Sequence, residues 1–230
     1  MRTIIIGDIH GCSVEFEALL SKVELNRKRD VLVLIGDVID RGPEPCLVLH
    51  RILELNRDMG ERFVFLRGNH EDLAIGAYTG DGRSLWDLNG GAKTRKSFYA
   101  AGERFQTYIP YLRSLKFFYE TEDFLCAHAA VSKEGPEKTD KRTFLWDRYV
   151  AYDGTYQGKL LIYGHTPMEE VLYQDGFGNE TVCLPDETRP LPKTGSICID
   201  TGCVRKNRLS ALVIENGRYT VRAVQYGKTR

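Results

Sequence analysis

The sequence predicts an α/β protein whose two halves differ in their secondary-structure pattern. Short apolar runs rich in Ile and Val occupy residues 2–6, 31–35 and 62–66, as in strands buried on both faces. Helical patterns separate these runs, and the β-α-β-α-β order predicts a parallel sheet with right-handed crossovers. After residue 114 strand patterns dominate, so the second half is expected to form a mixed or antiparallel sheet that faces the first.

The first two helices are predicted from N-terminal signals followed by apolar residues at helical spacing. Ser13 is expected to cap the first helix, with Glu15 in its first turn. Its apolar positions are Phe16, Leu19, Leu20 and Val23. The next helix is expected to start near Pro43. Its apolar stripe is Leu47, Val48, Ile52 and Leu55.

The remaining elements follow from the change in pattern along the chain. Residues 71–113 are expected to be mainly helical, with interruptions at 79–83 and 89–91. Strands are expected at 115–119, 123–127, 159–163, 169–174, 196–200, 208–214 and 218–225. Asn216-Gly217 predicts a hairpin between the last two, and 174–195 is expected to be a long loop. The whole chain, 1–230, is interpreted as one domain.

Composition restricts the class of protein. The 32 Lys and Arg balance the 32 Asp and Glu, so a partner bound mainly through phosphate charge, such as a nucleic acid, is not favoured. The apolar run at 3–6 is far too short for a signal-peptide core or a membrane span, and no later run approaches that length. The expectation is a cytoplasmic monomer without a membrane partner.

The six Cys residues contain no Cys-x-x-Cys pair. In a cytoplasmic chain structural disulfides are rare, so these residues are expected to be free. Cys46, Cys126 and Cys198 lie in apolar stretches and are expected to be small buried side chains. Cys12 is expected to be a neighbour of a helix start rather than a metal ligand.

Three motifs place metal-binding residue types directly after the first three predicted strands. They are Asp8-Ile9-His10-Gly11, Gly36-Asp37-Val38-Ile39-Asp40-Arg41-Gly42 and Gly68-Asn69-His70-Glu71. Because the carboxyl ends of parallel strands meet at one edge of a sheet, these side chains are expected to converge there. His128 and His165 also follow apolar runs.

Each motif alone has a structural explanation, since Asp8 and Asp37 could cap helices and Asn69 could belong to a turn. Of the five His residues, however, only His50 lies within a helical stripe, where a structural role is expected. The other four all follow predicted strands. Carboxylate, amide and imidazole donors, with one carboxylate able to bridge two cations, therefore indicate a two-metal hydrolytic site.

Together with His128-Ala129-Ala130 and Gly164-His165-Thr166, these motifs resemble, in order, a branch of the calcineurin-like metallophosphoesterases. The branch is that of the phosphoprotein phosphatases, in the form of the bacterial serine/threonine protein phosphatases. The resemblance covers nearly the whole chain and implies a four-layer α-β-β-α sandwich of two mixed sheets flanked by helices. One departure is that Ala129 and Ala130 replace a more usual Gly-containing pair.

The resemblance also implies two divalent metal ions, typically Mn²⁺, with Fe or Zn²⁺ as alternatives. The implied ligands form two sets that share Asp37 as a bridge. They are Asp8, His10 and Asp37 for one ion, and Asp37, Asn69, His128 and His165 for the other. Two cations about 3.5–4 Å apart polarise phosphoryl oxygens and activate a shared water. The hypothesis is direct in-line attack by a metal-bridging hydroxide, with no Ser or Cys nucleophile.

Further roles are carried over from the same family pattern. His70 is the candidate general acid and Asp40 its orienting partner. Arg41 and Arg148 are expected to bind phosphate, because a guanidinium can donate two parallel hydrogen bonds to it. For Arg148 a solvated surface position is the alternative. The segment Asp200-Thr201-Gly202 is expected to be a structural turn.

The leading interpretation is a dinuclear phosphoesterase of the protein serine/threonine phosphatase type, acting on phosphorylated proteins or small phosphoesters. A diadenosine tetraphosphatase is the alternative, and Asp40-Arg41-Gly42 and Glu71 favour the protein-phosphatase form. A non-catalytic binding module is disfavoured because no ligand and no acid is missing. Substrate choice is expected to depend on the rim segments 79–91 and 174–195.

Overall fold

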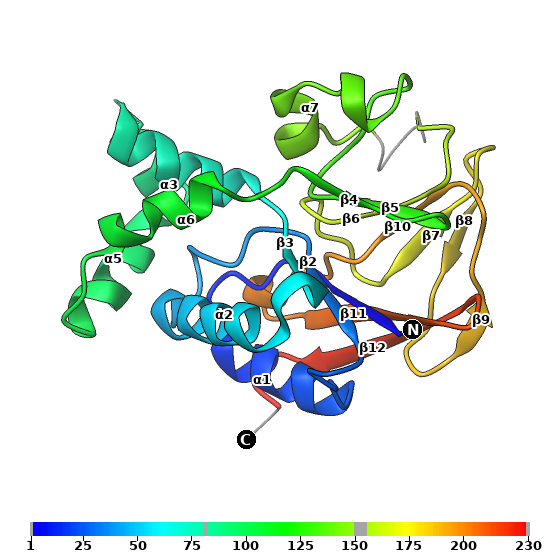
Figure 1. Ribbon diagram of the computed structural model, residues 1–230, viewed down its shortest axis with the longest axis horizontal. Coiled ribbons are helices and arrows are strands. Elements are labelled where there is room, and N and C mark those ends of the chain that lie inside the picture. Colours follow the sequence, from blue (N-terminus) through cyan, green and yellow to red (C-terminus); the bar gives the residue numbers. More distant parts are fainter. Residues whose placement is uncertain (1, 81, 150–155, 229–230) are drawn as a thin grey trace.

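The computed structural model describes residues 2–80, 82–149 and 156–228. Two six-stranded sheets lie face to face (Figure 1). The first has the order β3-β2-β1-β11-β12-β9, with bounds β3 Phe63–Phe65, β2 Val31–Leu34, β1 Thr3–Ile6, β11 Arg208–Glu215, β12 Arg218–Gln225 and β9 Thr188–Pro190. The second has the order β4-β5-β6-β10-β7-β8, with bounds β4 Phe118–Glu120, β5 Phe124–Ala127, β6 Leu160–Tyr163, β10 Ser196–Cys198, β7 Leu172–Gln174 and β8 Glu180–Val182.

Both sheets are mixed. In the first, β1, β2 and β3 are parallel as predicted, and β11 adds to β1 in the antiparallel direction. In the second, β5, β6 and β10 are parallel, and antiparallel strands flank them on both sides. The parallel strands of each sheet therefore present a common carboxyl edge.

Helices cover the outer faces of the two sheets. Their bounds are α1 Ser13–Lys22, α2 Pro45–Met59, α3 Asn69–Thr79, α4 Arg83–Leu88, α5 Gly91–Ala100, α6 Ile109–Arg113 and α7 Lys141–Trp146, with short 3₁₀ turns η1 Gly60–Arg62, η2 Phe105–Tyr108, η3 Pro136–Lys138 and η4 Cys203–Arg205. In Figure 1, α1 and α2 lie below the first sheet, α7 lies above the second, and α3, α5 and α6 gather at one end. The predicted four-layer α-β-β-α arrangement is confirmed.

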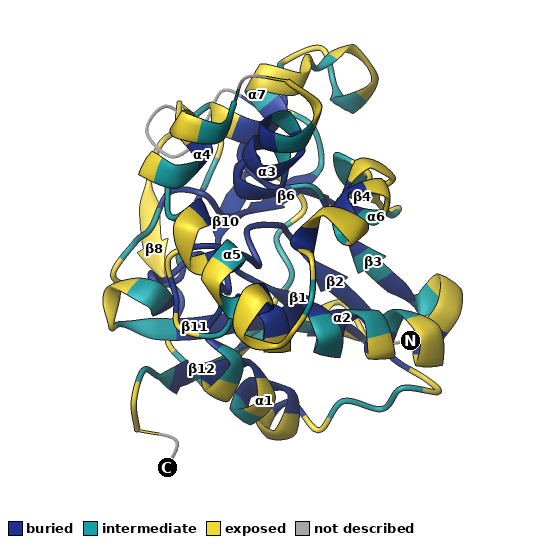
Figure 2. Ribbon diagram, turned by 90° about the vertical axis from the view of Figure 1, so that its left-hand side faces the viewer, coloured by how far each residue is buried: buried dark blue, intermediate teal, exposed yellow. Residues whose placement is uncertain are grey.

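Three apolar clusters fill the spaces between these layers. The alternation of side chains along a strand explains how β1 serves two of them. Ile4 and Ile6 pack toward α1 and α2, whereas Ile5 packs between the sheets with Val33 and Ile197. A third cluster joins the second sheet to Phe144 and its neighbours on α7. Figure 2 shows the resulting pattern, with buried strands inside and exposed positions on the outer helix faces.

The predicted division into a first-half sheet and a second-half sheet is wrong. The late strands β9, β11 and β12 belong to the first sheet. The reason is that β1 has a free edge after pairing with β2, and β11 satisfies the backbone groups along that edge. Residues 174–195 are likewise more than a loop, because they contain β8 of the second sheet and β9 of the first.

Two details of the predicted helices are also wrong. Cys12 rather than Ser13 occupies the N-cap of α1, and the Ser13 hydroxyl donates instead to the carboxylate of Glu44. In α2, which begins at Pro45, Leu47 is 54% exposed, and Leu49 takes the expected buried place in the stripe. Both helices otherwise bury the predicted apolar faces.

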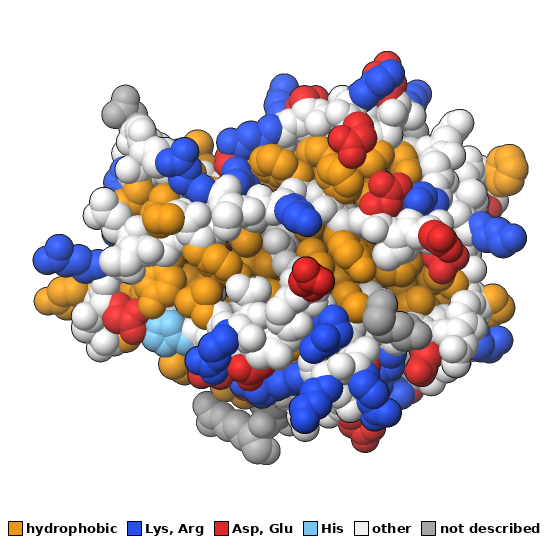
Figure 3. All heavy atoms as spheres, viewed as in Figure 1, with side chains coloured by type: hydrophobic (Ala, Val, Ile, Leu, Met, Phe, Trp, Pro, Cys, Tyr) orange, Lys and Arg blue, Asp and Glu red, His pale blue; other side chains and the backbone are white. Residues whose placement is uncertain are grey.

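The six Cys residues are all free, as predicted, and all are buried, including Cys46, Cys126 and Cys198, for which burial was predicted. Over the described parts of the chain, the helices are too short or too polar for any of them to span a membrane. On the face seen in Figure 3, hydrophobic atoms cross the middle, and side chains of both charges lie around them. The mixed charge of this face agrees with the balanced composition.

Candidate active site

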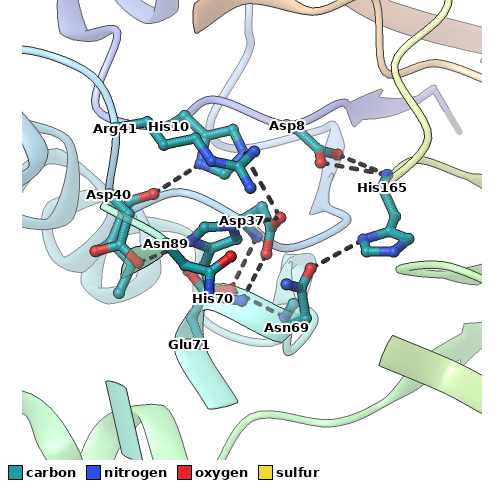
Figure 4. A network of polar contacts seen from close by, with 12 residues as sticks. Asp8, His10, Asp37, Asp40, Arg41, Asn69, His70, Glu71, Asn89 and His165 are labelled. Carbon is teal, nitrogen blue, oxygen red and sulfur yellow. Dashed lines mark hydrogen bonds and ion pairs between the residues drawn. The ribbon is translucent and has the colours of Figure 1, made fainter. Parts of the chain in front are cut away.

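The loops that follow the parallel strands bring the predicted site residues to one edge between the two sheets. Figure 4 shows this cluster from close by. Asp8 and His10 follow β1, Asp37 and Asp40 follow β2, Asn69 and His70 open α3 after β3, His128 follows β5 and His165 follows β6. The predicted convergence of residues distant in sequence is therefore present.

The loops are tight and their backbone is unusual. Of the nine described non-glycine residues with positive φ, five belong to this cluster: His10, Asp37, Asp40, Arg41 and His165. Such conformations cost free energy and persist where the surrounding structure fixes them, which is common at functional sites. Glycine permits the closest approach, since a Cβ on Gly36 would lie 2.7 Å from the Cα of Gly68.

Asp37 lies at the centre of the cluster and faces imidazoles on two sides. Its Oδ2 is 3.5 Å from His10 Nε2 and 3.9 Å from His70 Nε2, and its Oδ1 is 3.4 Å from His128 Nε2. Potential ligand atoms accordingly form two groups, one with His10 and His70 and one with His128 and His165. Asp37 belongs to both groups, as a bridging ligand would.

Backbone carbonyls orient two of these imidazoles. His10 Nδ1 lies 2.8 Å from the carbonyl oxygen of Ile39, and His128 Nδ1 lies 3.0 Å from that of Ile35. In each ring the Nδ1–H donates to the carbonyl, so the lone pair of Nε2 points toward Asp37. Metal-binding His side chains are usually held by the same kind of partner.

Asn69 lies on the side of the cluster that holds His128 and His165, and Asp8 contacts the backbone of His165. The side-chain oxygen of Asn69 lies 3.0 Å from His128 Nε2 and 2.9 Å from His165 Nδ1. The Asp8 carboxylate accepts from the backbone N–H of His165 at 3.2 Å and belongs to neither of the two groups of potential ligand atoms. The structure thus places Asp8 at the predicted edge, while His70 takes part in the group that contains His10.

His70 and Asp40 form a fully buried pair. His70 Nδ1 donates to Asp40 Oδ2 over 2.7 Å. Asp40 also accepts from the indole of Trp86 at 2.8 Å and from the hydroxyl of Thr94 at 2.6 Å. Three hydrogen-bonding groups therefore fix the carboxylate and, through it, the ring of His70, whose Nε2 remains free.

The charge states of the cluster suit cation binding. Burial, together with the charges of neighbouring groups, lowers the pKa of both His10 and His165 to about 3, so both rings are neutral. Burial alone would raise the pKa of Asp37, but the surrounding imidazoles, His128 and His70 foremost, hold it below its usual value. An ionised carboxylate beside the neutral imidazoles of His10 and His165 is a donor set that suits a divalent ion.

Buried acidic groups gather around the same point. Burial, together with the charges of Asp200 and Asp37, raises the pKa of Asp8 well above its usual value. Burial likewise raises the pKa of Asp200 to about 6 and that of Glu71 to about 7. Negative charges buried close together repel, and a bound cation would offset that repulsion.

Two buried nitrogen atoms of the cluster lack a hydrogen-bond partner, which bears on whether these residues could hold metal ions. Within the described residues, the buried Nε2 atoms of His70 and His165 have no hydrogen-bond partner. Buried polar groups without a partner are rare and call for an explanation such as an ion. With the shared carboxylate and the oriented imidazoles, they fit a dinuclear divalent centre.

The two predicted phosphate-binding Arg residues lie on the rim. Arg41 Nη1 is 3.0 Å from His10 Nε2, so its guanidinium lies over one side of the cluster. Arg148 follows α7, and its Nη1 donates to the carbonyl oxygen of His165 at 2.9 Å and to Thr166 Oγ1 at 3.2 Å. Arg148 is exposed, as the alternative of a surface position predicted, but its guanidinium is also hydrogen-bonded to the loop that contains His165.

The sequence reasoning assigned no role to Glu71, although the residue stood in a motif. Its carboxylate accepts from the backbone N–H groups of Asp37 at 2.8 Å, Val38 at 3.0 Å and Gly68 at 2.9 Å. Glu71 therefore connects the loop after β2 to the start of α3. Its position at the third residue of that helix is the local signal that would have indicated a capping role.

Three other residues near the site were missed or only partly described. Asp200 forms the predicted turn by accepting from the N–H of Gly202 at 2.9 Å, but its carboxylate is also buried beside Asp8. Its place just after β10, at the same sheet edge, was a usable signal. Trp86 and Thr94 lie inside helices, where no local pattern indicates a contact with Asp40.

Comparison with protein families gives one match. The model of the family described as calcineurin-like phosphoesterase matches residues 1–191. Serine/threonine-protein phosphatase 1 from Salmonella typhimurium is 30% identical over 178 residues, which are 71% of this chain and 78% of that protein.

Bis(5'-nucleosyl)-tetraphosphatases are also similar to this chain. The asymmetrical enzyme of Oceanobacillus iheyensis is 26% identical over 92% of this chain and 88% of its own length. The symmetrical enzyme of Pectobacterium carotovorum is 38% identical over 84 residues, but this match spans only 28% of that protein.

Solved structures share the fold. A putative diadenosine tetraphosphatase superposes with a TM-score of 0.67 at 21% identity, covering 99% of this chain and 94% of that one. A cold-active protein-tyrosine phosphatase from a Shewanella species gives 0.66 at 17% identity, covering 97% of this chain and 80% of that one. At these identities the likeness concerns the fold alone.

Proposed function

Because this chain belongs to the calcineurin-like phosphoesterase family, we propose that it hydrolyses phosphomonoesters, with phosphoserine and phosphothreonine in proteins as the substrate class. The observation that carries the proposal is the position of Asp37 between two groups of imidazoles. A single carboxylate placed in this way can bridge two cations, and two cations are suited to phosphoryl transfer.

The proposed metal ligands follow the two sides of Asp37. One divalent ion would be held by Asp8, His10 and Asp37, and the other by Asp37, Asn69, His128 and His165. When bound, the two ions would polarise the phosphoryl oxygens and supply an activated water. Manganese is the proposed metal. The carboxylate and imidazole donors would also suit iron and zinc, but the site contains no thiolate that would select the softer ions.

The side chain of His70 is proposed as the general acid. Its Nδ1 is bound to Asp40, so the free Nε2 faces the space beside Asp37. Although burial lowers the pKa of His70, the carboxylates of Asp37 and Asp40 raise it above its usual value, which favours the protonated ring that an acid needs. As the P–O bond of the ester breaks, the Nε2 proton would pass to the leaving oxygen.

Substrate phosphate is proposed to bind between the two rim Arg residues. Arg41 approaches from the loop after β2, and Arg148 approaches from the far side beside the His165 loop. Each guanidinium can donate two hydrogen bonds to a phosphate that is bonded to a single organic group. Arg41→Lys and Arg148→Lys are expected to raise KM more than they lower kcat.

A dinucleoside polyphosphate is the second candidate substrate. It is favoured by the similarity to the asymmetrical bis(5'-nucleosyl)-tetraphosphatase of Oceanobacillus iheyensis, which extends over 92% of this chain. Both candidates use the same proposed metal ligands and acid. The two substrates differ in the group attached to the phosphate. The residues around the rim of the site, rather than the proposed metal ligands, would therefore decide between them.

The deciding experiment compares two substrates on one Mn²⁺-reconstituted sample. Phosphate release from a phosphoserine peptide is expected to exceed hydrolysis of diadenosine tetraphosphate in kcat/KM. The reverse order would replace the proposed substrate class and leave the centre intact. Activity on neither substrate, in a sample that binds two metal ions, would overturn the proposed function. The Asp37→Asn variant serves as the inactive control.

A further inference from the structure

A second cluster of ligand atoms, separate from the one around Asp37, lies between α2 and the chain from α5 to η2. Cys46 and His50 are one helical turn apart on α2, and Glu103 approaches them from the segment between α5 and η2. Their ligand atoms lie within 4.8 Å of one another. The hydroxyl of Tyr108, at the end of η2, is 3.1 Å from His50 Nε2. Four donors from three segments thus surround one point.

The distances in this cluster match those around a tetrahedral ion. Cys46 Sγ is 3.6 Å from His50 Nε2, and His50 Nε2 is 3.1 Å from both carboxylate oxygens of Glu103. In a tetrahedral zinc site the usual bond lengths place sulfur about 3.6 Å from nitrogen, and nitrogen about 3.3 Å from oxygen. The sulfur, the carboxylate and the hydroxyl all lie within 3.6 Å of His50 Nε2, so the four donors are close enough together to share one ion.

We propose that Cys46, His50 and Glu103 form a binding site for one Zn²⁺ ion, with the Tyr108 hydroxyl beside the fourth position. Thiolate, imidazole and carboxylate together are a donor set that zinc accepts and that Mg²⁺, Ca²⁺ and Mn²⁺ do not favour. The side chains of His50 and Glu103 are 36% and 34% exposed, so an ion can enter from solvent without unfolding the chain.

Ion pairing between His50 and Glu103 explains part of the cluster but not the position of Cys46. A protonated His50 would satisfy Glu103, and the Tyr108 hydroxyl also donates to that carboxylate. Neither contact requires a sulfur atom beside the same nitrogen. Burial and the charge of Glu103 raise the pKa of Cys46 to about 11, so the thiol is protonated in the metal-free protein. Zinc binding would therefore release the thiol proton to solvent.

The proposed ion would connect α2 to the segment directly after α5, and both helices lead to the Asp40–His70 pair. α2 starts five residues after Asp40, and the backbone N–H of Cys46 donates to Ser97 Oγ of α5 at 3.2 Å. α5 also carries Thr94, whose hydroxyl donates to Asp40. An ion bound by Cys46, His50 and Glu103 would hold α2 against α5 and so stabilise the support of Asp40, with no contact to substrate.

The test uses Co²⁺ as a spectroscopic substitute for zinc in enzyme already loaded with Mn²⁺. A thiolate bound to Co²⁺ gives a strong near-ultraviolet charge-transfer band, which the nitrogen and oxygen donors around Asp37 cannot produce. We expect one equivalent of Co²⁺ to generate the band, and one equivalent of Zn²⁺ to abolish it. Cys46→Ser is expected to remove it, and Glu103→Gln to weaken binding at least about tenfold.

Cys203→Ser is the matched control, because Cys12, Glu15 and Cys203 form the other thiol-containing cluster of the described residues. The band should persist in this variant. Its absence from the wild type, or its survival in Cys46→Ser, would overturn the proposal. His50→Gln, which leaves the thiol in place, gives an independent test if Cys46→Ser folds poorly. The spectrum does not depend on hydrolysis, so its result is separate from that for the proposed function.

Discussion

At the scale of single residues, the His70–Asp40 pair combines two conditions that a general acid needs. The ring is held in one orientation by a carboxylate that itself has partners in Trp86 and Thr94. The same carboxylate, with Asp37, raises the pKa of the ring above its usual value and so favours its protonated form. Position and charge therefore depend on the same contact, and removing the imidazole should affect proton transfer before it affects metal binding.

The first prediction concerns the leaving group. His70→Asn is expected to lower kcat by about 10²–10⁴-fold on a phosphoserine peptide, whose alkoxide must be protonated to leave. On p-nitrophenyl phosphate the loss should be much smaller, because that leaving group departs without a proton. Steady-state kinetics with metal analysis provides the measurement. Equal losses on both substrates, or a fall in bound metal that matches the fall in rate, would contradict the assignment.

The second prediction concerns Glu71. Glutamine offers one acceptor oxygen where the carboxylate offers two, so one or more of three backbone N–H groups would lose a partner. Glu71→Gln is expected to reduce the free energy of unfolding by about 1–3 kcal/mol. Urea denaturation measures this loss. Glu122→Gln, at an exposed position, is the control and should change stability little; similar losses in both variants would refute the connecting role.

Single-residue patterns predicted the donors of the site better than their supports. Asp8, His10, Asp37, Asn69, His70, His128 and His165 could be found because each follows an apolar run, and the sheet brings such positions together. Trp86 and Thr94 contact Asp40 only because α4 and α5 pack beside it. That packing cannot be predicted from the local sequence. Asp200 also follows a strand, but its neighbours suggested only a structural turn, and the burial of its carboxylate beside Asp8 was not predicted.

At the scale of elements, the ends of β1 and β2 are joined opposite the active-site edge. Arg2 precedes β1 and Asp30 precedes β2, and their side chains meet with N–O distances of 2.6 and 3.2 Å. Asp30 also accepts from the N–H of Asn26 at 2.7 Å. Burial opposes ionisation of Asp30, but these hydrogen bonds prevail and lower its pKa. The contact links the starts of the two paired strands that lead to the loops of Asp8 and Asp37.

The third prediction is the pH dependence of this contact. Because the pKa of Asp30 is lower in the folded chain than in the unfolded one, its stabilisation is complete above about pH 4, the ordinary range of an Asp carboxyl, and is lost as the pH falls through the folded value. Asp30→Asn is therefore expected to cost about 1–2 kcal/mol at pH 7 and progressively less in acid.

Chemical denaturation of both proteins between pH 2.5 and 7 provides the measurement. The exposed Asp123→Asn variant is the control and should show no such dependence. A difference between wild type and Asp30→Asn that stays constant with pH would contradict the proposed linkage.

Element prediction failed where pairing partners are distant in sequence. The strands β1, β2 and β3 were recognised because their residues are apolar throughout. β8 consists of exposed residues and β9 of exposed and half-buried ones, so neither has the alternation that marks a strand. Their conformation comes from the neighbouring strands β7 and β12, to which they are hydrogen-bonded. For the same reason the sheet to which β11 belongs could not be read from its own sequence.

At the scale of the whole molecule, the two sheets meet where the buried acids are most numerous. Asp8, Asp37, Glu71 and Asp200 are all 5% exposed or less. Their mutual repulsion destabilises the folded chain, and a bound cation would offset it. The overall stability of the protein is therefore expected to depend on bound metal, as it does wherever a ligand binds only the folded state.

The fourth prediction is the size of that dependence. At free metal about 1,000-fold above Kd, one ion contributes about 4 kcal/mol. For a chain of this length, removal of metal by a chelator is expected to lower Tm by on the order of 10 °C. Calorimetry of the Cys46→Ser variant isolates the Asp37 centre from the proposed zinc site. The same shift in Asp37→Asn, or no shift in Cys46→Ser, would contradict the prediction.

The pairing of β1 with β11 has a consequence for biosynthesis. β1 is synthesised long before β11, yet one of its two edges is covered only by β11, with Ile4 opposite Val213. A nascent chain can form the β1-β2-β3 unit early, but it then exposes an unpaired strand edge until β11 has also been synthesised. From this order of strands we expect chaperones to shield the free edge of β1. We also expect a slow final folding step, in which β11 and β12 add to the sheet.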